Sequence, residues 1–309
     1  MNLRKTPVAL IVGAALLSLA ACGSGGDPLA TTKSAGSGGS SGKGTIVVGS
    51  ADFPESALLA EIYAGALEAK GVKVEKKLNI GSREAYIPAL KDGSIDLIPE
   101  YTGVLAQYFN EKASATESDA VYEELKAALP DTLTVLDKSA AEDKDAVVVT
   151  QATADKYHLT SIGDLKPVAG DLTLGGPPEW KTRPTGVPGL EKVYGLKFKS
   201  FRALDAGGPL TVKALENGQI DAGNIFTTDP NIETKHFVVL QDPENLYAAQ
   251  NVVPLITKSK LDDTITQALN AVSAALDTDT LTALLKRVVI DKEDEADVAA
   301  DFLKEHDLG

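Results

Sequence analysis

The chain has 309 residues and an acidic composition, with 44 Asp and Glu against 30 Lys and Arg and a formal net charge of −14. This balance argues against a nucleic-acid-binding protein, because phosphates require clustered basic residues, and it also argues against adhesion to an anionic lipid surface. Cys22 is the only cysteine. We therefore expect no disulfide framework and a stability that comes from packed apolar cores.

The first residues are typical of an export signal. Arg4 and Lys5 precede an apolar run that ends in Leu19-Ala20-Ala21-Cys22 and is shorter than a membrane-spanning helix requires. The end of this run resembles the lipobox of bacterial lipoproteins. We expect a signal peptide over residues 1–21, lipid attachment at Cys22, and an extracytoplasmic protein held to the cell membrane through that lipid alone. The alternative is a secreted protein with a chance cysteine at this position.

A low-complexity segment follows the cysteine. Gly, Ser, Ala and Thr dominate it up to Lys43, and such a composition cannot bury enough apolar area to fold. We expect residues 22–43 to be a lipid anchor and flexible tether, and the folded body to begin at Gly44.

Strands and helices are predicted to alternate along the body. Thr45–Gly49 is a β-rich run typical of a buried strand, and Asp52 could cap the helix that follows, which Gly71 would end. The pattern further predicts a strand over 72–80, a helix over 83–91, strands over 95–98 and 147–150, renewed alternation to about 240 and a helical tail over 262–303. Such alternation indicates an α/β protein with ligands beyond the carboxyl ends of the strands.

One octapeptide pattern occurs twice. Ala89–Asp96 recurs as Ala214–Asp221, and each copy reads as a helix end, a glycine turn and an entering strand. An aromatic residue stands five positions after each aspartate, as Tyr101 and as Phe226. Chance similarity explains the glycines better than the paired aromatics. We therefore favour two lobes of like topology, each sending one aromatic ring into a shared cleft.

Several landmarks in order make the chain resemble a known family. They are 49–55 (GSADFPE), 101–103 (YTG), 176–180 (GPPEW) with Arg183 and 189–190 (GL), 227–229 (TTD), and 251–254 (NVVP). The chain resembles the substrate-binding lipoproteins of osmoprotectant ABC importers, the glycine betaine/choline/carnitine class (ProX-like, OpuAC-type). The resemblance implies an α/β, two-lobed periplasmic-binding-protein fold (type II-like) with the ligand between the lobes. It places lobe 1 at 44–140 plus 252–309 and lobe 2 at 141–251.

The resemblance also implies a ligand site. Members hold a quaternary ammonium against aromatic ring faces and clamp a carboxylate with arginine and threonine. The ligand-binding residues that it implies or suggests here are Phe53, Tyr101, Thr102, Trp180, Arg183, Phe226, Thr227, Gln250 and Asn251. The chain departs from the family's pattern at Val104, Ala146 and Gln250, where a hydroxyl or rings are usual. These departures predict weak binding of glycine betaine and choline.

Each of these residues also has a structural interpretation. Phe226 and Trp180 could pack in a core, and Arg183 could pair with Glu179 or Glu191 on the surface. Gln250 and Asn251 could satisfy backbone groups where the chain crosses between lobes.

Enzyme chemistry has little support in the sequence. His158, His236 and His306 are the only histidines and none has metal-ligand spacing to another, and the lone cysteine is used by the anchor. We expect no metal and no cofactor, and a monomeric solute receptor whose partners are a small osmoprotectant-like solute and the permease of an ABC importer. The alternatives are a more polar solute such as a polyol, a glycoside or an amino-acid-like compound, or an envelope sensor with the same fold.

Overall fold

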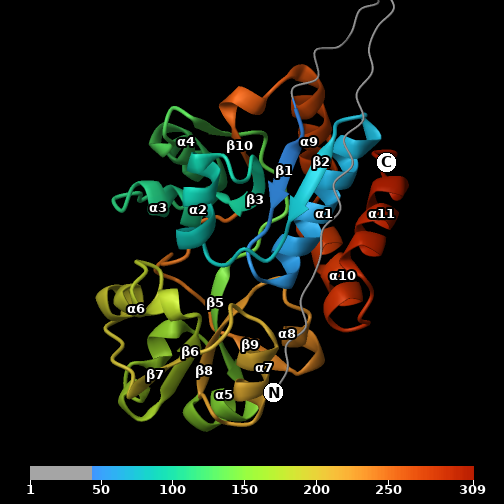
Figure 1. The fold of residues 1–309 in the computed structure, drawn as a ribbon. Coiled ribbons are helices and arrows are strands. Elements are labelled where there is room, and N and C mark those ends of the chain that lie inside the picture. The colour runs from blue at the N-terminus through green and yellow to red at the C-terminus, as the bar shows by residue number, and fades with distance from the viewer. Residues whose placement is uncertain (1–43) are drawn as a thin grey trace, which may run out of the picture. The chain divides into compact units, whose positions relative to one another are not determined.

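The computed structural model describes residues 44–309, and its framework is two mixed sheets of five strands each (Figure 1). The expected signal peptide, the tether and Cys22 lie outside the described residues. Among residues 44–309, no helix combines the length and the apolar character needed to cross a bilayer.

The first sheet has the strand order β2-β1-β3-β10-β4. Its strands are β1 (Ile46–Gly49), β2 (Val74–Lys77), β3 (Leu97–Tyr101), β4 (Leu133–Val135) and β10 (Val252–Thr257). β1 pairs in parallel with β2 and β3, whereas β10 runs antiparallel to β3 and β4. This sheet and its helices form the upper part of Figure 1, which we call the first lobe.

The second sheet repeats the same plan in the order β7-β6-β8-β5-β9. Its strands are β5 (Asp145–Thr150), β6 (Thr173–Gly176), β7 (Ser200–Ala203), β8 (Ala222–Phe226) and β9 (Phe237–Val239). β6 is parallel to β7 and β8, and β5 is antiparallel to β8 and β9. With its helices this sheet forms the second lobe, so the prediction of two lobes of like topology is confirmed.

The octapeptide repeat has an equivalent structural role in both lobes. The Asp96 carboxylate accepts the backbone N–H of Val47 (2.9 Å), and the Asp221 carboxylate accepts that of Thr173 (2.8 Å). Each aspartate thereby fixes the start of the strand that leads to the cavity described below. Tyr101 and Phe226 are the last residues of the equivalent strands β3 and β8.

Helices cover both sheets. Their bounds are α1 (Pro54–Ala69), α2 (Arg83–Asp92), α3 (Thr102–Phe109), α4 (Ser118–Ala128), α5 (Gln151–Tyr157), α6 (Val187–Tyr194), α7 (Pro209–Glu216), α8 (Asn231–Thr234), α9 (Asp263–Ala275), α10 (Thr278–Val289) and α11 (Glu295–Glu305), with short 3₁₀ turns at Ile162–Leu165, Ala169–Asp171, Pro178–Lys181 and Lys258–Lys260. The predicted helical tail is confirmed as α9–α11. It packs on α1 (Figure 1), and Leu269, Leu285 and Phe302 share one apolar core with Leu58 and Ile62.

Gly71 and Gly93 end α1 and α2 as predicted, with positive φ angles of 77° and 79°. Two other local predictions differ from the structure. Asp52, however, is not the cap of α1, because Phe53 holds the N-cap position and its side chain makes no cap hydrogen bond. The strand expected over 95–98 begins later and extends to Tyr101.

The chain crosses between the lobes twice, over 136–144 and 240–251. The two crossing segments run antiparallel, with a bridge between Glu142 and Asn251 and backbone hydrogen bonds such as Asp143 N–H to Gln250 carbonyl (3.0 Å). These paired segments contribute Asp143 and Gln250 to the cavity lining, and Asp145 follows in the lining at the start of β5.

Candidate solute-binding site

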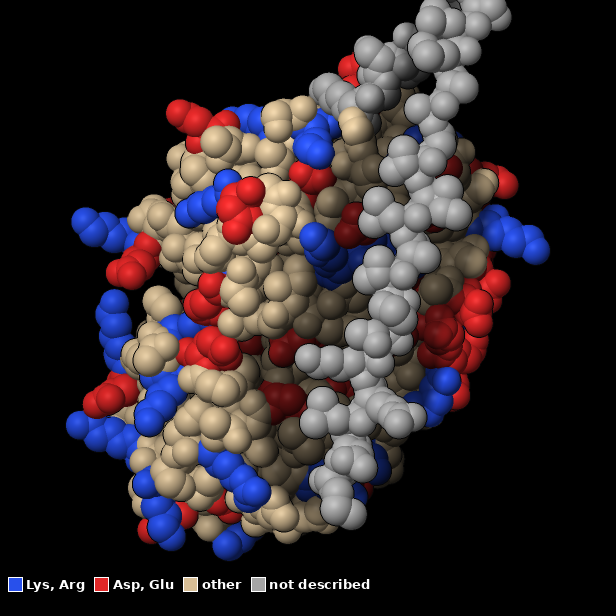
Figure 2. Space-filling view, viewed as in Figure 1, with Lys and Arg blue, Asp and Glu red and all other residues tan. Residues whose placement is uncertain are grey.

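A cavity of about 330 Å³ opens between the two lobes at the carboxyl ends of their parallel strands. Residues that follow β1, β2, β6 and β7 line it, together with residues of β3, α3, β5 and β8 and of both crossing segments. Figure 2 shows a hollow between the lobes with acidic side chains recessed in it. Ligands in open α/β sheets bind at this end of the strands, which makes the cavity the candidate site.

One side of the cavity is a continuous wall of three aromatic rings. The centroid of Phe53 lies 6.2 Å from that of Tyr101 and 5.2 Å from that of Phe226. Phe53 and Tyr101 come from the first lobe and Phe226 from the second, so the wall spans the gap between them. The ring of Phe53 is tilted by 31° against that of Tyr101 and by 41° against that of Phe226, and it connects the rings of the two lobes.

Behind this wall, Glu55 connects the lobes. The Tyr101 hydroxyl donates to one Glu55 oxygen (2.5 Å) and the Thr228 hydroxyl donates to the other (2.6 Å). Asp143, on the first crossing segment, accepts the backbone N–H of Thr228 (3.1 Å). Burial raises the pKa of both carboxyl groups, and their mutual repulsion raises that of Asp143 further.

A second buried cluster supports the first lobe's side of the cavity. Arg83 donates from Nε and Nη2 to the two Glu100 oxygens (2.7 and 2.8 Å), and the Tyr86 hydroxyl also donates to Glu100 (2.7 Å). Arg83 is 8% exposed and Glu100 is fully buried. The two-point ion pair holds the guanidinium of Arg83 at the cavity lining.

Arg183 closes the cavity from the second lobe. Its Nε and Nη2 donate to the two oxygens of Glu84 on α2 of the first lobe (3.1 and 2.8 Å). Burial alone would raise the pKa of Glu84, but the hydrogen bond and charge of Arg183 outweigh it and lower the pKa to about 2. The predicted carboxylate clamp therefore already holds a carboxylate, and it belongs to the other lobe.

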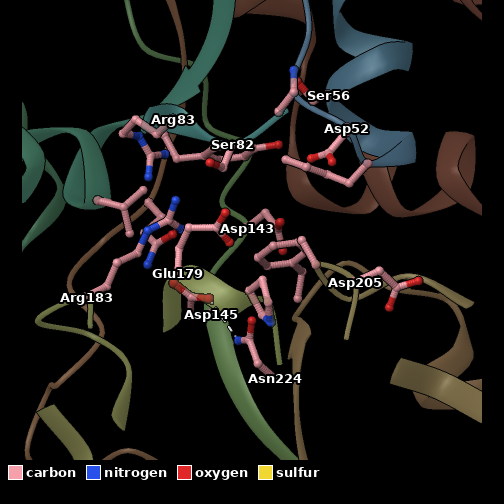
Figure 3. Close-up of a pocket in the computed structure, with 18 of the residues that line it drawn as sticks. Asp52, Ser56, Ser82, Arg83, Asp143, Asp145, Glu179, Arg183, Asp205 and Asn224 are labelled. Carbon is pink, nitrogen blue, oxygen red and sulfur yellow. Dashed lines mark hydrogen bonds between the residues drawn. The ribbon is translucent and has the colours of Figure 1, made fainter. Parts of the chain in front are cut away.

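The second lobe also contributes polar side chains to the floor of the cavity. Asn224 donates from Nδ2 to Asp145 (2.9 Å), and Figure 3 draws this bond between the two labelled side chains. Asp205 lines the cavity as well, but its oxygens accept the backbone N–H groups of Leu210 and Thr211 at the start of α7 (both 2.8 Å).

The residues predicted from the sequence divide into two groups. Those that line the cavity are Phe53, Tyr101, Arg183, Phe226 and Gln250, and those that do not are Thr102, Trp180, Thr227 and Asn251. The second group has structural contacts. The Thr102 hydroxyl donates to the Ala249 carbonyl (3.2 Å) and accepts the Asn251 N–H (3.0 Å). The Asn251 side chain accepts the Ser118 hydroxyl (2.5 Å) and donates to the Ser139 carbonyl (3.1 Å).

Trp180 and Thr227 likewise have other surroundings. Trp180 is 1% exposed in the core of the second lobe and stacks on Tyr247 at 6.5 Å. The Thr227 hydroxyl accepts the Lys144 N–H (2.9 Å) and donates to Asp143 (3.2 Å). The resemblance suggested Trp180 as a ligand contact, whereas in this structure the 3₁₀ turn Pro178–Lys181 carries its ring into that core.

Sequence reasoning overlooked Arg83, Glu55, Asp143 and Asn224. Arg83 and Glu55 stand in the first turns of helices, where charged residues are usually solvated, and Asp143 lies in an acidic stretch. Asn224 offered one usable signal, because it interrupts the otherwise apolar strand β8. A buried polar residue in such a strand requires a partner.

Two lobes of this topology with a cavity between them form the two-lobed periplasmic-binding-protein fold, type II-like. The chain belongs to the family described as the substrate binding domain of ABC-type glycine betaine transport systems, whose model matches residues 44–305. Members of this family are extracytoplasmic proteins that bind small solutes and work with a transporter permease, and they are not enzymes.

Individual relatives agree with this assignment. The chain is 30% identical over 274 residues to the glycine betaine-binding protein YehZ of Escherichia coli K12, covering 84% of this chain and 90% of the relative. It is 28% identical over 225 residues to the carnitine transport binding protein OpuCC of Listeria monocytogenes, covering 71% and 72%. The crystal structure of a glycine betaine/carnitine/choline ABC transporter protein matches with a TM-score of 0.67 at 23% identity, covering 85% of this chain and 99% of that one.

Proposed function

We propose that this protein captures a small osmoprotectant-like amine or betaine in the cavity between its lobes and delivers it to an ABC importer. The observation that carries the proposal is the pairing of a three-ring wall with the guanidinium groups of Arg83 and Arg183 in one cavity. Ring faces attract an alkylated cation and guanidinium groups attract a carboxylate, which together suit a zwitterion. The glycine betaine and carnitine binding of the relatives supports the same class.

We further propose closure of lobe 1 (44–140 plus 252–309) on lobe 2 (141–251), with the crossing segments as the hinge. The paired backbone of these segments and the interlobe contacts of Glu55 and Arg183 support this proposal. We propose that the protein acts as a monomer, because both lobes that face the cavity are formed by the same chain.

We propose that Cys22 carries a lipid that holds the protein at the cell membrane after removal of residues 1–21. The lipobox-like sequence and the lack of another cysteine support this step. A Cys22→Ala protein, expressed in a host that processes lipoproteins, should leave the membrane fraction. Retention of that variant in the membrane after a high-salt wash would exclude lipid anchoring.

Solute binding is tested on residues 44–309 by thermal shift and calorimetry. The panel contains glycine betaine, choline, carnitine and the analogues of glycine betaine that carry fewer methyl groups. A ligand that binds only the folded protein raises its melting temperature. We expect at least one member of this panel to bind, and absence of binding by all of them would exclude the proposed solute class.

A further inference from the structure

Asn224 is a fully buried side chain with unused hydrogen-bonding capacity at the cavity floor. Its Nδ2 donates to Asp145 (2.9 Å), whereas its Oδ1 has no hydrogen-bond partner within residues 44–309. A carboxylate accepts hydrogen bonds, so the Nδ2 of Asn224 must face Asp145, and this fixes the orientation of the amide. Asn224 belongs to the cavity lining, and Figure 3 shows its amide linked to Asp145 among the other lining residues. A buried acceptor of this kind calls for a donor from a ligand.

Asp145 adds a carboxyl group at the same place. It faces Phe226 in the register between β5 and β8, and Asn224 lies two residues before Phe226 on the same face of β8. Asp145 is 9% exposed. The two acceptors therefore stand side by side, next to the ring that ends the wall.

The charged groups around the cavity favour a cation at this position. The lining contains the carboxyl groups of Asp52, Asp143, Asp145, Glu179 and Asp205 and the guanidinium groups of Arg83 and Arg183. Both guanidinium groups are held by glutamates, Glu100 and Glu84. The Asp205 oxygens are taken by backbone N–H groups.

A quaternary ammonium cannot satisfy these acceptors, since it carries no N–H. We infer that the solute's cationic nitrogen carries N–H donors and that Asn224 and Asp145 receive them, which makes this pair the determinant of specificity between amines and fully methylated ammonium compounds. This inference rests on the proposed function and names its substrate class more narrowly.

The test is a series in which each step replaces one N-methyl group with N–H at constant charge: glycine betaine, N,N-dimethylglycine, sarcosine and glycine. We expect calorimetry at neutral pH to show N,N-dimethylglycine binding about tenfold or more tightly than glycine betaine, as a charge-assisted hydrogen bond would provide. This comparison uses the unaltered protein and so does not depend on any variant folding.

The Asp145→Asn variant tests whether Asn224 and Asp145 cause the preference for N,N-dimethylglycine over glycine betaine. The new amide removes the charge and can donate to Asn224 Oδ1, so the preference should fall to within about twofold. Asp131→Asn is the matched control, because Asp131 is exposed and does not line the cavity; it should keep the full preference.

The outcomes separate the inference from the proposed function. Glycine betaine binding at least as tightly as N,N-dimethylglycine would overturn the inference and leave the proposed function standing. A preference for N–H that persists unchanged in Asp145→Asn would overturn the role of the pair. If no compound of this series binds, and neither choline nor carnitine does, both the inference and the proposed function are wrong.

Discussion

Arg183 and Glu84 join the two lobes through a two-point ion pair at the edge of the solute cavity. The pair is only partly shielded, since the side chains are 26% and 46% exposed. Ion pairs with this exposure contribute about 0.2–1 kcal/mol. The Arg183 guanidinium group also lines the cavity. It can therefore stabilise the contact between the lobes, bind the ligand, or do both.

A comparison of Arg183→Ala with Glu84→Gln separates these roles. Glu84→Gln removes only the interlobe pair and should weaken solute binding by less than about fivefold. Arg183→Ala also removes a ligand contact, and we expect a loss of about tenfold or more, mainly through faster release. Calorimetry and stopped-flow dissociation measure both effects. Equal, small losses in the two variants would show that Arg183 only holds the lobes together.

The hydroxyl of Thr228 provides a second connection between the lobes, this one buried. Thr228→Val keeps the shape of the side chain but removes the donor to Glu55, and Thr228 is 1% exposed. We expect the free energy of unfolding to fall by about 1–3 kcal/mol, because Glu55 loses a partner inside the protein. Thr227→Val is the neighbouring control at an exposed position and should cost less. Urea denaturation of the three proteins gives the comparison, and equal losses would contradict the role of Glu55.

The framework of this molecule was accessible from its sequence because it depends on local patterns. Apolar runs, helical spacing and glycines at positive φ located the strands and helix ends, as at Gly71 and Gly93. The octapeptide repeat went further and placed Tyr101 and Phe226 at equivalent strand ends. These features depend on the residue types close to each position in the sequence, so they could be predicted without the tertiary contacts.

The polar part of the site was largely inaccessible for the opposite reason. The chain has 44 acidic residues, and nothing local distinguishes Glu55 or Asp143 from those that stay solvated. Their burial results from contacts between segments far apart in the chain, such as Glu55 with Thr228. Likewise, only the packing of the second lobe shows that Trp180 lies inside.

Gly103 illustrates how the crossing segment restricts the residues beside the site. A Cβ at this position would lie 2.6 Å from the Ala249 carbonyl oxygen, which is backbone and cannot turn away. Alanine normally favours a helix over glycine by about 0.5–1 kcal/mol, but this overlap should outweigh that gain. We expect Gly103→Ala to lower the free energy of unfolding by about 1–2 kcal/mol. Gly170→Ala, where a Cβ meets no atom within 4 Å, is the control and should not be destabilised; an equally stable Gly103→Ala protein would refute the close approach.

The carboxyl groups of Glu55 and Asp143 should make stability depend on pH. Burial raises both pKa values above their ordinary values of 4.5 and 3.8, so the folded state binds more protons than the unfolded chain. The stability from this pair is therefore fully present below about pH 4 and is lost as pH rises through the raised folded-state pKa values. Asp143→Asn keeps an oxygen that can accept the Thr228 N–H and removes one titrating group. Glu84, whose pKa is lowered to about 2, acts in the opposite sense, and its contribution to stability is lost only as pH falls below about 4.

Urea unfolding from pH 4 to pH 8 should show the free energy of unfolding of the unaltered protein falling relative to that of the Asp143→Asn variant. A difference between these two proteins that stays constant from pH 4 to pH 8 would contradict the raised pKa of Asp143.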